Sequence, residues 1–502
     1  MSRKGKIYLV GAGPGDKGLL TLKGAQVLSK ADLVFYDNLV NPEILEYAPP
    51  HANCVYVGKR GLGDKTSQTH IEDQLVQAVQ EGKCVIRLKG GDPFLFGRGG
   101  EEAERLAQEN IPFEIVPGVS SLIAAPAYAG IPLTHRDWSS TLAFVTGYTQ
   151  ENSPYPIDWP ALAKMQTIVL VMGVKTLQGN CARLLQGGMR GSTPVAIIRW
   201  GTTPRQKTYI STLEKVADEM QQIKLMPPVV MVIGEVVKLR SKLCWYEKLP
   251  LFGKKILVTR AASQISELSD GLSALGAEVY KVPSLEFSAP DSWEDLDQVS
   301  QNLSQFEWLV FSSAQGVEFF MKHFLSLHPD IRLFPKIKIA CVGPKTALAL
   351  EKFYLKADRV AQNSSAAGLA QEMILGKMIH GKVLFVRAQE GREEFVERLL
   401  QENIFLTMVF AYKTQACSEG VQKLQQGLDF GKLDLLLFAS ASAIKNLFAL
   451  LNEAQKNMLL KRPCLCIGPT TAQTAKDFGF LSVVQSEIPS VESLIEKAIG
   501  CF

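Results

Sequence analysis

Short runs of aliphatic and β-branched residues alternate with longer amphipathic segments along the whole chain. Many of the short runs lead directly into Gly, Ser or Pro and then into a helical pattern, which is typical of βα units in predominantly parallel sheets. Ligands of such sheets bind beyond the carboxyl ends of the strands, so functional residues are expected in the loops that follow them. The predicted strands include residues 7–10, 33–36, 85–88, 168–172, 256–259, 309–312, 339–342, 383–386, 435–438 and 465–467.

The second half of the chain contains three sequence blocks that recur in the same order. Residues 253–260 resemble 381–387, residues 308–320 resemble 435–448, and residues 339–350 resemble 465–475. This repetition predicts two similar α/β lobes. Two such lobes usually bind a ligand in the cleft between them, although a duplication can also serve architecture alone.

A change of pattern near residue 250 predicts a domain boundary. The segment 240–253 carries charge, Pro250 and a terminal glycine, and a new βα pattern begins at Lys254. With 502 residues, the chain is long enough for about three folding units. We therefore predict an N-terminal domain at 1–246, a linker at 247–252 and a C-terminal domain at 253–502.

Composition narrows the class of protein. Hydrophobic residues make up 46% and charged residues 21% of the chain, which is ordinary for a globular protein and excludes disordered and coiled-coil classes. The 54 basic and 50 acidic side chains leave a net charge of +4, which is too small for a general nucleic-acid binder. We therefore expect no nucleic-acid partner, and local basic clusters must meet any anionic ligand.

Cysteine usage and hydropathy indicate a reduced, cytoplasmic protein. The nine cysteines are scattered, form no CxxC pair and mostly have apolar neighbours. Cys464 and Cys466 would share one face of a strand. We expect them to be buried core thiols, and the alternative is that the two form a metal or redox site. No hydrophobic stretch reaches the ~18 residues that a membrane span requires, and the N-terminal run is too brief for a signal peptide. We expect no membrane partner and no metal site.

The loop VGAGPGD at 10–16 follows the first predicted strand and only superficially matches a dinucleotide-binding fingerprint. Asp16 stands where the third glycine is needed, and Pro14 lacks the backbone N–H that would face a pyrophosphate. An adenosyl group without phosphates fits this loop better, and a tight turn without a ligand is the alternative. A second glycine-rich segment, at 87–102, has no P-loop pattern, but its Phe94 and Phe96 could wall an apolar pocket.

Five motifs occur in register in the first half: VGAGPGD, LVFYDNLV, VGKRG, RLKGGDPFLFGRGGEE and VPGVSSLIAAPAYAGIPLTHR. Together they resemble the uroporphyrinogen-III C-methyltransferase family over about residues 5–246. The resemblance implies a two-lobed α/β methyltransferase, usually a homodimer, that binds S-adenosylmethionine between its lobes and releases S-adenosylhomocysteine. The cofactor would then contact Pro14, Gly90, Gly91, Asp92, Leu95, Ser120, Ser121, Met172 and Gly201. Leu95 and Ser121 differ modestly from the commonest family form, which leaves fine contact geometry open.

The same resemblance implies roles for charged residues. Asp37 matches the family's proposed general base and Lys59 its proposed acid partner, because the macrocycle must shed protons after a pyrrole carbon has attacked the methyl group. From the residues alone, Asp37 could instead cap a helix and Lys59 could bind a carboxylate. The substrate carries several carboxylates, for which the candidate anchors are Arg60, Lys89, Arg98, His135 and Arg136.

The second half shows no nucleophile–base pattern, metal cluster or phosphate loop, but its strand-end loops are rich in hydroxyl groups and glycine. In a parallel sheet the backbone N–H groups of the following helices suit anions, although each loop alone could be a helix cap. Arg260, Lys345, Arg387 and Lys413 could add positive charge, so the loops together predict a polycarboxylate site. These loops are 312–316, 343–346, 440–443 and 468–471.

A second set of motifs, VTR, VFSSAQGV, CVGPKT, FAYKT, FASASAI and IGPTTA, resembles the uroporphyrinogen-III synthase family over nearly the whole second half. These motifs are shorter and looser than the first set. The resemblance implies two lobes, about 253–287 plus 414–502 and 288–413, that close hydroxymethylbilane with inversion of its last ring and loss of water. Tyr412 matches the family's candidate proton donor, with a packing tyrosine as the alternative. The substrate would contact Ser313, Lys345, Thr346, Ser440 and Thr470.

The sequence therefore predicts an α/β protein in which a two-lobed tetrapyrrole methylase precedes a two-lobed, internally duplicated synthase. The synthase would make uroporphyrinogen III, and the methylase would methylate it twice to give precorrin-2. One alternative makes the C-terminal half a non-catalytic tetrapyrrole-binding module. Another makes the methylase act on a later corrinoid or on an RNA nucleotide, and the small net charge weighs against RNA.

Overall fold

The computed structural model describes residues 5–58, 68–148, 155–260, 265–283, 285–363, 365–390, 394–416 and 430–502. The described residues divide into two compact units. One comprises the chain up to Lys255 together with Gly271–Glu278 and Phe502, and the other comprises Ile256–Asp270 and Val279–Cys501. Within the described residues, no helix is long and apolar enough to cross a membrane.

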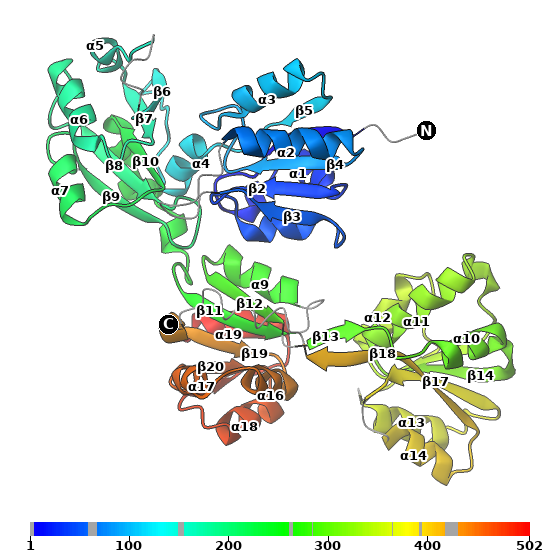
Figure 1. Cartoon of the computed structure of the whole chain (residues 1–502). Coiled ribbons are helices and arrows are strands. Elements are labelled where there is room, and N and C mark those ends of the chain that lie inside the picture. The colour runs from blue at the N-terminus through cyan, green and yellow to red at the C-terminus, as the bar shows by residue number, and fades with distance from the viewer. Residues whose placement is uncertain are drawn as a thin grey trace. The chain divides into compact units, whose positions relative to one another are not determined.

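The first sheet of the N-terminal unit is formed by β1 (Lys6–Gly11), β2 (Leu33–Tyr36), β3 (Asn53–Tyr56), β4 (Cys84–Lys89) and β5 (Phe113–Val116). Its helices are α1 (Leu22–Leu28), α2 (Gln68–Gln80), α3 (Gly99–Gln108) and α4 (Ser121–Tyr128), with 3-10 helices at Lys17–Leu19 and Pro42–Tyr47. The strands run parallel in the order β3-β2-β4-β1-β5 (Figure 1). The central strands are mostly apolar because both faces are covered, with Leu9 in one hydrophobic cluster and Val10 in the other. Arg87 and Lys89, both in β4, are buried exceptions.

The second sheet of this unit is formed by β6 (Leu142–Thr146), β7 (Thr167–Val171), β8 (Pro194–Arg199), β9 (Lys207–Thr212) and β10 (Val229–Ile233). Its helices are α5 (Trp159–Leu162), α6 (Leu177–Gln186), α7 (Val216–Gln222) and α8 (Arg240–Leu243), with 3-10 helices at Glu235–Leu239 and Tyr246–Lys248. The order is β6-β7-β10-β8-β9, and β10 runs antiparallel to both neighbours. Because Val230 lies opposite both Val171 and Ile198, the carboxyl ends of β7 and β8 reach the same edge of the sheet.

Two further sheets lie almost wholly in the C-terminal unit. One is formed by β11 (Lys255–Arg260), β12 (Glu278–Pro283), β19 (Leu435–Phe438), β20 (Cys464–Cys466) and β21 (Val483–Gln485), in the order β12-β11-β19-β20-β21. The other is formed by β13 (Leu285–Ser288), β14 (Phe306–Phe311), β15 (Lys338–Cys341), β16 (Arg359–Val360), β17 (Lys382–Ala388) and β18 (Leu406–Ala416), in the order β13-β18-β17-β14-β15-β16. The chain therefore leaves the first of these sheets after β12 and returns to it after β18.

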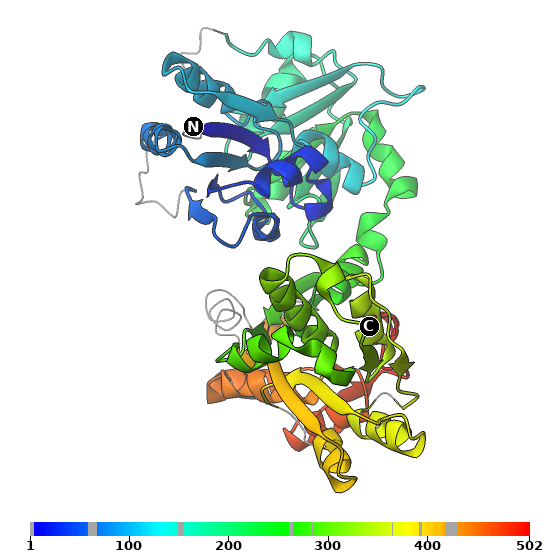
Figure 2. The same ribbon diagram turned by 90° about the vertical axis from the view of Figure 1, so that its right-hand side faces the viewer.

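Helices cover these sheets as well. They are α9 (Ile265–Ala274), α10 (Glu294–Gln301), α11 (Ala314–Leu327), α12 (Pro344–Glu351), α13 (Ala366–Leu375), α14 (Glu394–Gln401), α16 (Ala441–Ala449), α17 (Glu453–Leu460), α18 (Pro469–Asp477) and α19 (Val491–Ile499), with 3-10 helices at Leu303–Gln305, Ile331–Leu333 and Phe430–Lys432. In the larger sheet, alternate residues of β14 and β17 pack against α11 and α12 on one face and against α13 and α14 on the other. The two pairs of helices lie on opposite faces of this sheet (Figures 1 and 2).

The predicted duplication is present in the topology. Strands β11, β19 and β20 are parallel neighbours in one sheet, and β17, β14 and β15 are parallel neighbours in the other. In both sheets the second of these strands enters its helix through a serine N-cap, Ser440 or Ser313. The third enters its helix through a Gly-Pro pair. The α/β fold class and the internal duplication are confirmed.

Each predicted strand overlaps an observed one, with small differences at the ends. Predicted strands 168–172, 309–312, 339–342 and 465–467 end one residue too late. Met172 shows why, because its φ of +57° places it in a turn that apolar character alone does not reveal.

Polar contacts extend the packing of the N-terminal unit into the segment predicted as a linker, 247–252. Glu247 accepts hydrogen bonds from Gln206 and Thr208 and pairs with Arg240. Leu251 is fully buried. The predicted domain bounds stay a prediction.

Candidate active sites

Three glycines meet where β1, β4 and β5 end. An ideal Cβ on Gly118 would lie 2.3 Å from the carbonyl oxygen of Gly91 and 2.7 Å from the Cα of Gly11. Gly13 and Gly91 exchange backbone hydrogen bonds with N···O distances of 3.2 and 2.7 Å. No side chain fits at Gly11 or Gly118, so these two glycines are what allows the three loops to approach one another.

Asp92 holds two of these loops in place. One of its carboxylate oxygens accepts the N–H groups of Phe94 and Leu95 at 2.8 and 3.0 Å, and the other accepts the N–H of Gly118 at 2.9 Å. Charge-assisted bonds of this kind are strong. The side chain of this predicted cofactor residue therefore shapes the loops themselves.

A Cβ on Gly91 would meet only ordinary van der Waals contacts. Gly91 has a φ of +70°, and an ideal Cβ on it would come no nearer than 3.8 Å, to the backbone nitrogen of Ser121. Ser120 is the N-cap of α4, and its hydroxyl accepts the N–H of Leu122 at 3.3 Å. The backbone nitrogen of Ser121, in the first turn of α4, therefore borders the Cβ position of Gly91.

The second sheet brings Met172 and Gly201 toward the same place. Met172 directly follows β7, and its side chain is more than half exposed. An ideal Cβ on Gly201 would lie 2.4 Å from the Cβ of Ala125 in α4. The first loop meets this one, because an ideal Cβ on Gly15 would lie 3.5 Å from the carbonyl oxygen of Gly201. The structure therefore brings together predicted cofactor residues from both sheets.

Polar contacts also join the two sheets. The backbone N–H of Asp16 donates to the hydroxyl of Thr202 at 3.2 Å, and Oδ2 of Asp16 accepts the hydroxyl of Tyr128 at 2.7 Å. Burial and then the bond to Asp16 raise the pKa of Tyr128, which keeps its hydroxyl protonated as a donor. Asp16, which in the sequence argued only against a dinucleotide, thus links the two sheets.

The loop that carries Met172 is held by α6. The carbonyl oxygen of Gly147 accepts hydrogen bonds from Thr176 Oγ1 at 2.6 Å and from Asn180 Nδ2 at 3.0 Å. An ideal Cβ on Gly147 would lie 2.4 Å from the Cα of Gly173, so the two loops touch. Asn180 is only 1% exposed, and its amide fixes the backbone of Gly147, which touches the loop of Met172.

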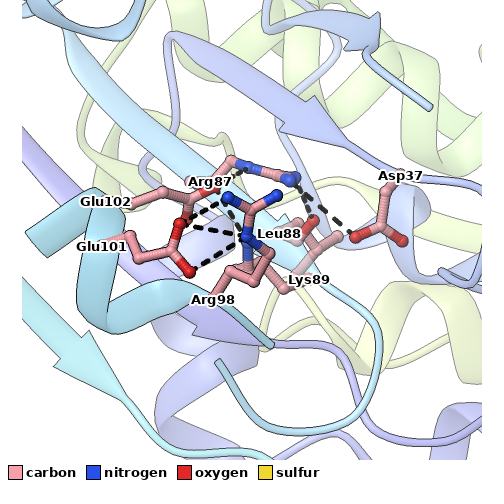
Figure 3. A network of polar contacts seen from close by, with 7 residues as sticks. All are labelled: Asp37, Arg87, Leu88, Lys89, Arg98, Glu101 and Glu102. Atoms are coloured by element: carbon pink, nitrogen blue, oxygen red, sulfur yellow. Dashed lines mark hydrogen bonds and ion pairs between the residues drawn. The ribbon is translucent and has the colours of Figure 1, made fainter. Parts of the chain in front are cut away.

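A cluster of charged side chains lies beside Asp37 (Figure 3). Arg87 and Lys89 both contact Oε1 of Glu102, which lies 3.2 Å from Arg87 Nε and 2.9 Å from Lys89 Nζ. These three side chains are at most 6% exposed. Arg87 Nη2 lies 3.9 Å from Oδ2 of Asp37, and Oδ1 of Asp37 accepts the N–H of Leu39 at 3.0 Å. Burial, followed by the charge of Arg87, lowers the pKa of Lys89.

The other predicted charged residues of this unit are placed differently. Lys59 and Arg60 lie outside the described residues. Arg136 is exposed, and so is Arg98, whose guanidinium pairs with Glu101. His135 is half-buried. Lys89 stands apart from these predicted anchors because it is buried against a carboxylate of the protein itself.

In the C-terminal unit, Tyr412 and Ser313 come together. The Tyr412 hydroxyl lies 3.0 Å from Oγ of Ser313, and Ser313 also caps α11 by accepting the N–H of Gly316 at 3.0 Å. Tyr412 is 7% exposed. Burial raises its pKa, although the bond to Ser313 and the charge of Arg387 act in the opposite direction.

The remaining predicted synthase residues lie at helix starts. Ser440 caps α16 by accepting the N–H of Ala443 at 3.1 Å, as the cap interpretation of its loop predicts. Thr346 is buried in the first turn of α12, whereas Lys345 and Thr470 are exposed in the first turns of α12 and α18. Contact of these residues with a substrate stays a prediction.

Cys464 and Cys466, the first and last residues of β20, are both fully buried in the hydrophobic core as free thiols. Within the part of the chain that the structure describes, no group of three or more His, Cys, Asp and Glu side chains is placed to hold a metal ion.

Sequence reasoning missed Glu102, Arg87, Tyr128 and Asn180. A usable signal existed for the first pair, since two cations at alternate positions of the apolar strand VIRLK require a buried carboxylate. Tyr128 and Asn180 act through contacts with loops that are far away in sequence, so no local sequence pattern predicts their roles.

Two family models match the chain. The model described as tetrapyrrole (corrin/porphyrin) methylases matches residues 6–217, and the model described as uroporphyrinogen-III synthase HemD matches residues 266–496.

Known relatives match the same parts. A porphyrin biosynthesis protein HemD from Ruminiclostridium josui is 36% identical over 496 residues, which is 99% of this chain and 98% of that protein. A uroporphyrinogen-III C-methyltransferase from Bacillus subtilis (strain 168) is 49% identical over 244 residues, which is 48% of this chain and 95% of that protein. The solved structure of uroporphyrin-III C-methyl transferase from Thermus thermophilus complexed with S-adenyl homocysteine covers 47% of this chain and 99% of its own, with 39% identity and a TM-score of 0.41.

The glycine-lined strand ends of one unit and the duplicated lobes of the other define a methylase joined to a second α/β unit. The chain belongs to the family of porphyrin biosynthesis proteins represented by HemD of Ruminiclostridium josui, as a fusion of a tetrapyrrole methylase with a uroporphyrinogen-III synthase. Both resemblances expected from the sequence are confirmed.

Proposed function

We propose that the chain is a bifunctional enzyme of tetrapyrrole biosynthesis. Its C-terminal domain, at 253–502, converts hydroxymethylbilane to uroporphyrinogen III, and its N-terminal domain, at 1–246, methylates that product twice to give precorrin-2. The observation that carries this proposal is that a methylase match and a synthase match follow one another in a single chain, with one relative matched over 98% of its length.

S-adenosylmethionine is the proposed methyl donor and S-adenosylhomocysteine its product. The bound cofactor supplies an electrophilic methyl group. The chain binds and orients it through the uncrowded backbone at Gly91, the contact between Gly15 and Gly201, and the loop of Met172, which touches the fixed backbone of Gly147. The proposed contacts are Pro14, Gly90, Gly91, Asp92, Leu95, Ser120, Ser121, Met172 and Gly201.

Asp37 is the proposed general base of the methylation. Its Oδ1 is held by the N–H of Leu39, which leaves Oδ2 to take a proton from the macrocycle once a ring carbon has bonded to the methyl group. The bond to that hydrogen breaks, and its electron pair restores the conjugation of the ring. Lys59 is the proposed acid partner, and Arg60, Lys89, Arg98 and Arg136 are the proposed partners of substrate carboxylates.

Tyr412 is the proposed proton donor of the synthase. The carbon–oxygen bond of the hydroxymethyl group breaks, and the departing oxygen takes the phenolic proton and leaves as water. The methylene carbon that remains bonds to a carbon of the last ring, and the proton lost from the rings on closure restores the phenol. The contact between the Tyr412 hydroxyl and Ser313 at the start of α11 supports this role. Burial raises the pKa of Tyr412, so the phenol keeps its proton until the departing oxygen takes it. Ser313, Lys345, Thr346, Ser440 and Thr470 are the proposed substrate contacts, in a cleft between lobes at about 253–287 plus 414–502 and at 288–413. The remainder of the rate enhancement comes from holding the flexible linear substrate in the conformation that closes with the last ring inverted.

The assembly and location are also proposals. We propose a homodimer formed through the methyltransferase domain, a cytoplasmic location, and no nucleic-acid or membrane partner. The net charge of +4 supports the absence of a nucleic-acid partner, and the free state of the described cysteines supports a reducing compartment.

Freshly prepared hydroxymethylbilane, given to the purified full chain without S-adenosylmethionine, tests the synthase. Chromatography of the oxidised products is expected to show predominantly uroporphyrin isomer III. Isomer I, the spontaneous product, would leave the C-terminal half as a binding module. Adding S-adenosylmethionine is then expected to consume isomer III with transfer of two methyl groups.

A further inference from the structure

We propose that Glu102 is a positioning residue for methyl transfer, which acts on Asp37 through Arg87. This inference rests on the role of Asp37 under the proposed function. It gives a purpose to a carboxylate that lies entirely inside the protein.

The burial of Glu102 is the first argument. Its side chain is 0% exposed, and charged side chains are almost never fully buried unless they are paired. Its Oε1 meets two cations, Arg87 and Lys89, which project from the same face of β4. An arrangement that removes three charges from water needs every contact to be well placed, so the geometry around Glu102 is tightly constrained.

The guanidinium of Arg87 transmits this constraint. Its Nε lies 3.2 Å from Glu102 Oε1, and its Nη1 donates to the carbonyl oxygen of Leu88 at 3.0 Å. Because a guanidinium is planar and rigid, two fixed nitrogens also fix the third. That third nitrogen, Nη2, is the one that faces Asp37, at 3.9 Å from Oδ2 (Figure 3).

Charge balance is the second argument. Arg87 and Lys89 carry two positive charges, and Glu102 neutralises one of them. An ionised Asp37 supplies the other negative charge, so the four groups sum to zero only in the form of Asp37 that accepts a proton. Without Glu102, two buried cations would face Asp37 alone, and Arg87 would be free to turn toward it.

The test compares Glu102→Gln with Glu104→Gln, which changes an exposed carboxylate on the same helix. Affinity for S-adenosylhomocysteine is measured by calorimetry, and kcat and KM for methylation of uroporphyrinogen III are measured on the full chain. Glu102→Gln is expected to lower kcat roughly 10-fold or more while cofactor affinity stays within about twofold. Glu104→Gln is expected to change neither quantity.

A double-mutant cycle separates positioning from general damage. Glu102→Gln is repeated in the Asp37→Ala background, where it is expected to cause no further loss of kcat, since a residue that acts through Asp37 has nothing left to position. Losses that multiply would overturn the inference. An Asp37→Ala variant with unchanged kcat would instead refute the proposed base, and that outcome is visible independently.

A second variant covers the case in which Glu102→Gln loses cofactor binding. Arg87→Lys keeps a cation for Glu102 but removes the nitrogen that faces Asp37. It enters the same cycle with the same criterion: a loss of kcat that disappears in the Asp37→Ala background supports the positioning role, and a multiplicative loss contradicts it.

Discussion

At the carboxyl ends of β1, β4 and β5, a methyl group on Gly118 would lie 2.3 Å from the backbone of the neighbouring loop. At the carboxyl end of β20 in the C-terminal unit, a methyl group on Gly468 would meet nothing within 4 Å. Both glycines stand just before a helix in a parallel sheet. The first therefore occupies a crowded junction of three loops, whereas the second occupies an open helix start.

The contrast follows the chemistry proposed for each unit. Methyl transfer joins two bound molecules, and their alignment requires a rigid surface shaped in advance. Closure of a linear tetrapyrrole requires control over one flexible substrate, and we propose that helix starts with hydroxyl caps such as Ser313 and Ser440 supply its polar contacts.

The largest effect is expected from Gly118→Ala. A methyl group against the backbone of Gly91 costs about 3 kcal/mol, which corresponds to about 100-fold weaker binding of S-adenosylhomocysteine, measurable by calorimetry. Formation of isomer III by the C-terminal unit is expected to stay unchanged.

Gly179→Ala is the matched control in the N-terminal unit, because nothing lies within 4 Å of its added methyl group. Gly468→Ala is expected to leave the melting temperature unchanged, and a large drop would show that the two kinds of strand end do not differ as described.

Tyr412→Phe is expected to give the next largest effect. Loss of the proton donor should slow hydroxymethylbilane consumption about 100-fold, while methylation of supplied uroporphyrinogen III continues at its normal rate. Loss of one hydrogen bond to Ser313 should cost only about 1 kcal/mol of stability. A variant that retains its synthase rate would identify Tyr412 as a packing residue, and the C-terminal site would then depend on conformational control alone.

The fold was predictable from the sequence because apolar runs, turn residues and repeated blocks are local signals. The contacts of the sites were predictable only in part. The glycine loops and Asp37 stand in dense motifs, whereas the link from Asp16 to Tyr128 spans 112 positions and depends on how the two sheets meet. Serine loops of the C-terminal unit are ambiguous for a different reason, since a helix cap and an anion contact use the same residue types at the same place.

A middle-sized effect is expected from Tyr128→Phe. Without the hydroxyl of Tyr128, Oδ2 of Asp16 loses a hydrogen-bond donor. The contact between the loop of Asp16 and the loop of Thr202 is then held less firmly. An unsatisfied acceptor costs about 1–3 kcal/mol, so binding of S-adenosylhomocysteine should weaken about 10-fold. Tyr246→Phe is the matched control, because this neighbouring buried tyrosine makes only a long 3.4 Å bond to Thr202. Equal effects of both substitutions would point to ring packing and not to the link through Asp16.

The smallest effect is expected at the amino ends of the strands in the first sheet of the N-terminal unit. There, Glu114 of β5 pairs with Lys23 and Lys6. Hydrogen bonds from Lys23 and then Lys6 lower the pKa of Glu114 from 4.5 to about 2. A lowered pKa in the folded state means that the pair stabilises the fold above pH 4.5 and loses this contribution as the pH falls toward 2. Because the pair is partly solvated, Glu114→Gln should destabilise the unit by less than about 1 kcal/mol at neutral pH, with less effect in high salt.

The melting transition that shifts with S-adenosylhomocysteine reports on this unit. The difference in melting temperature between Glu114→Gln and the parent chain should shrink between pH 4.5 and 2. A loss of free energy as large as that of Gly118→Ala would mean that the methylase site depends on contacts throughout the sheet and not only on those at its carboxyl edge.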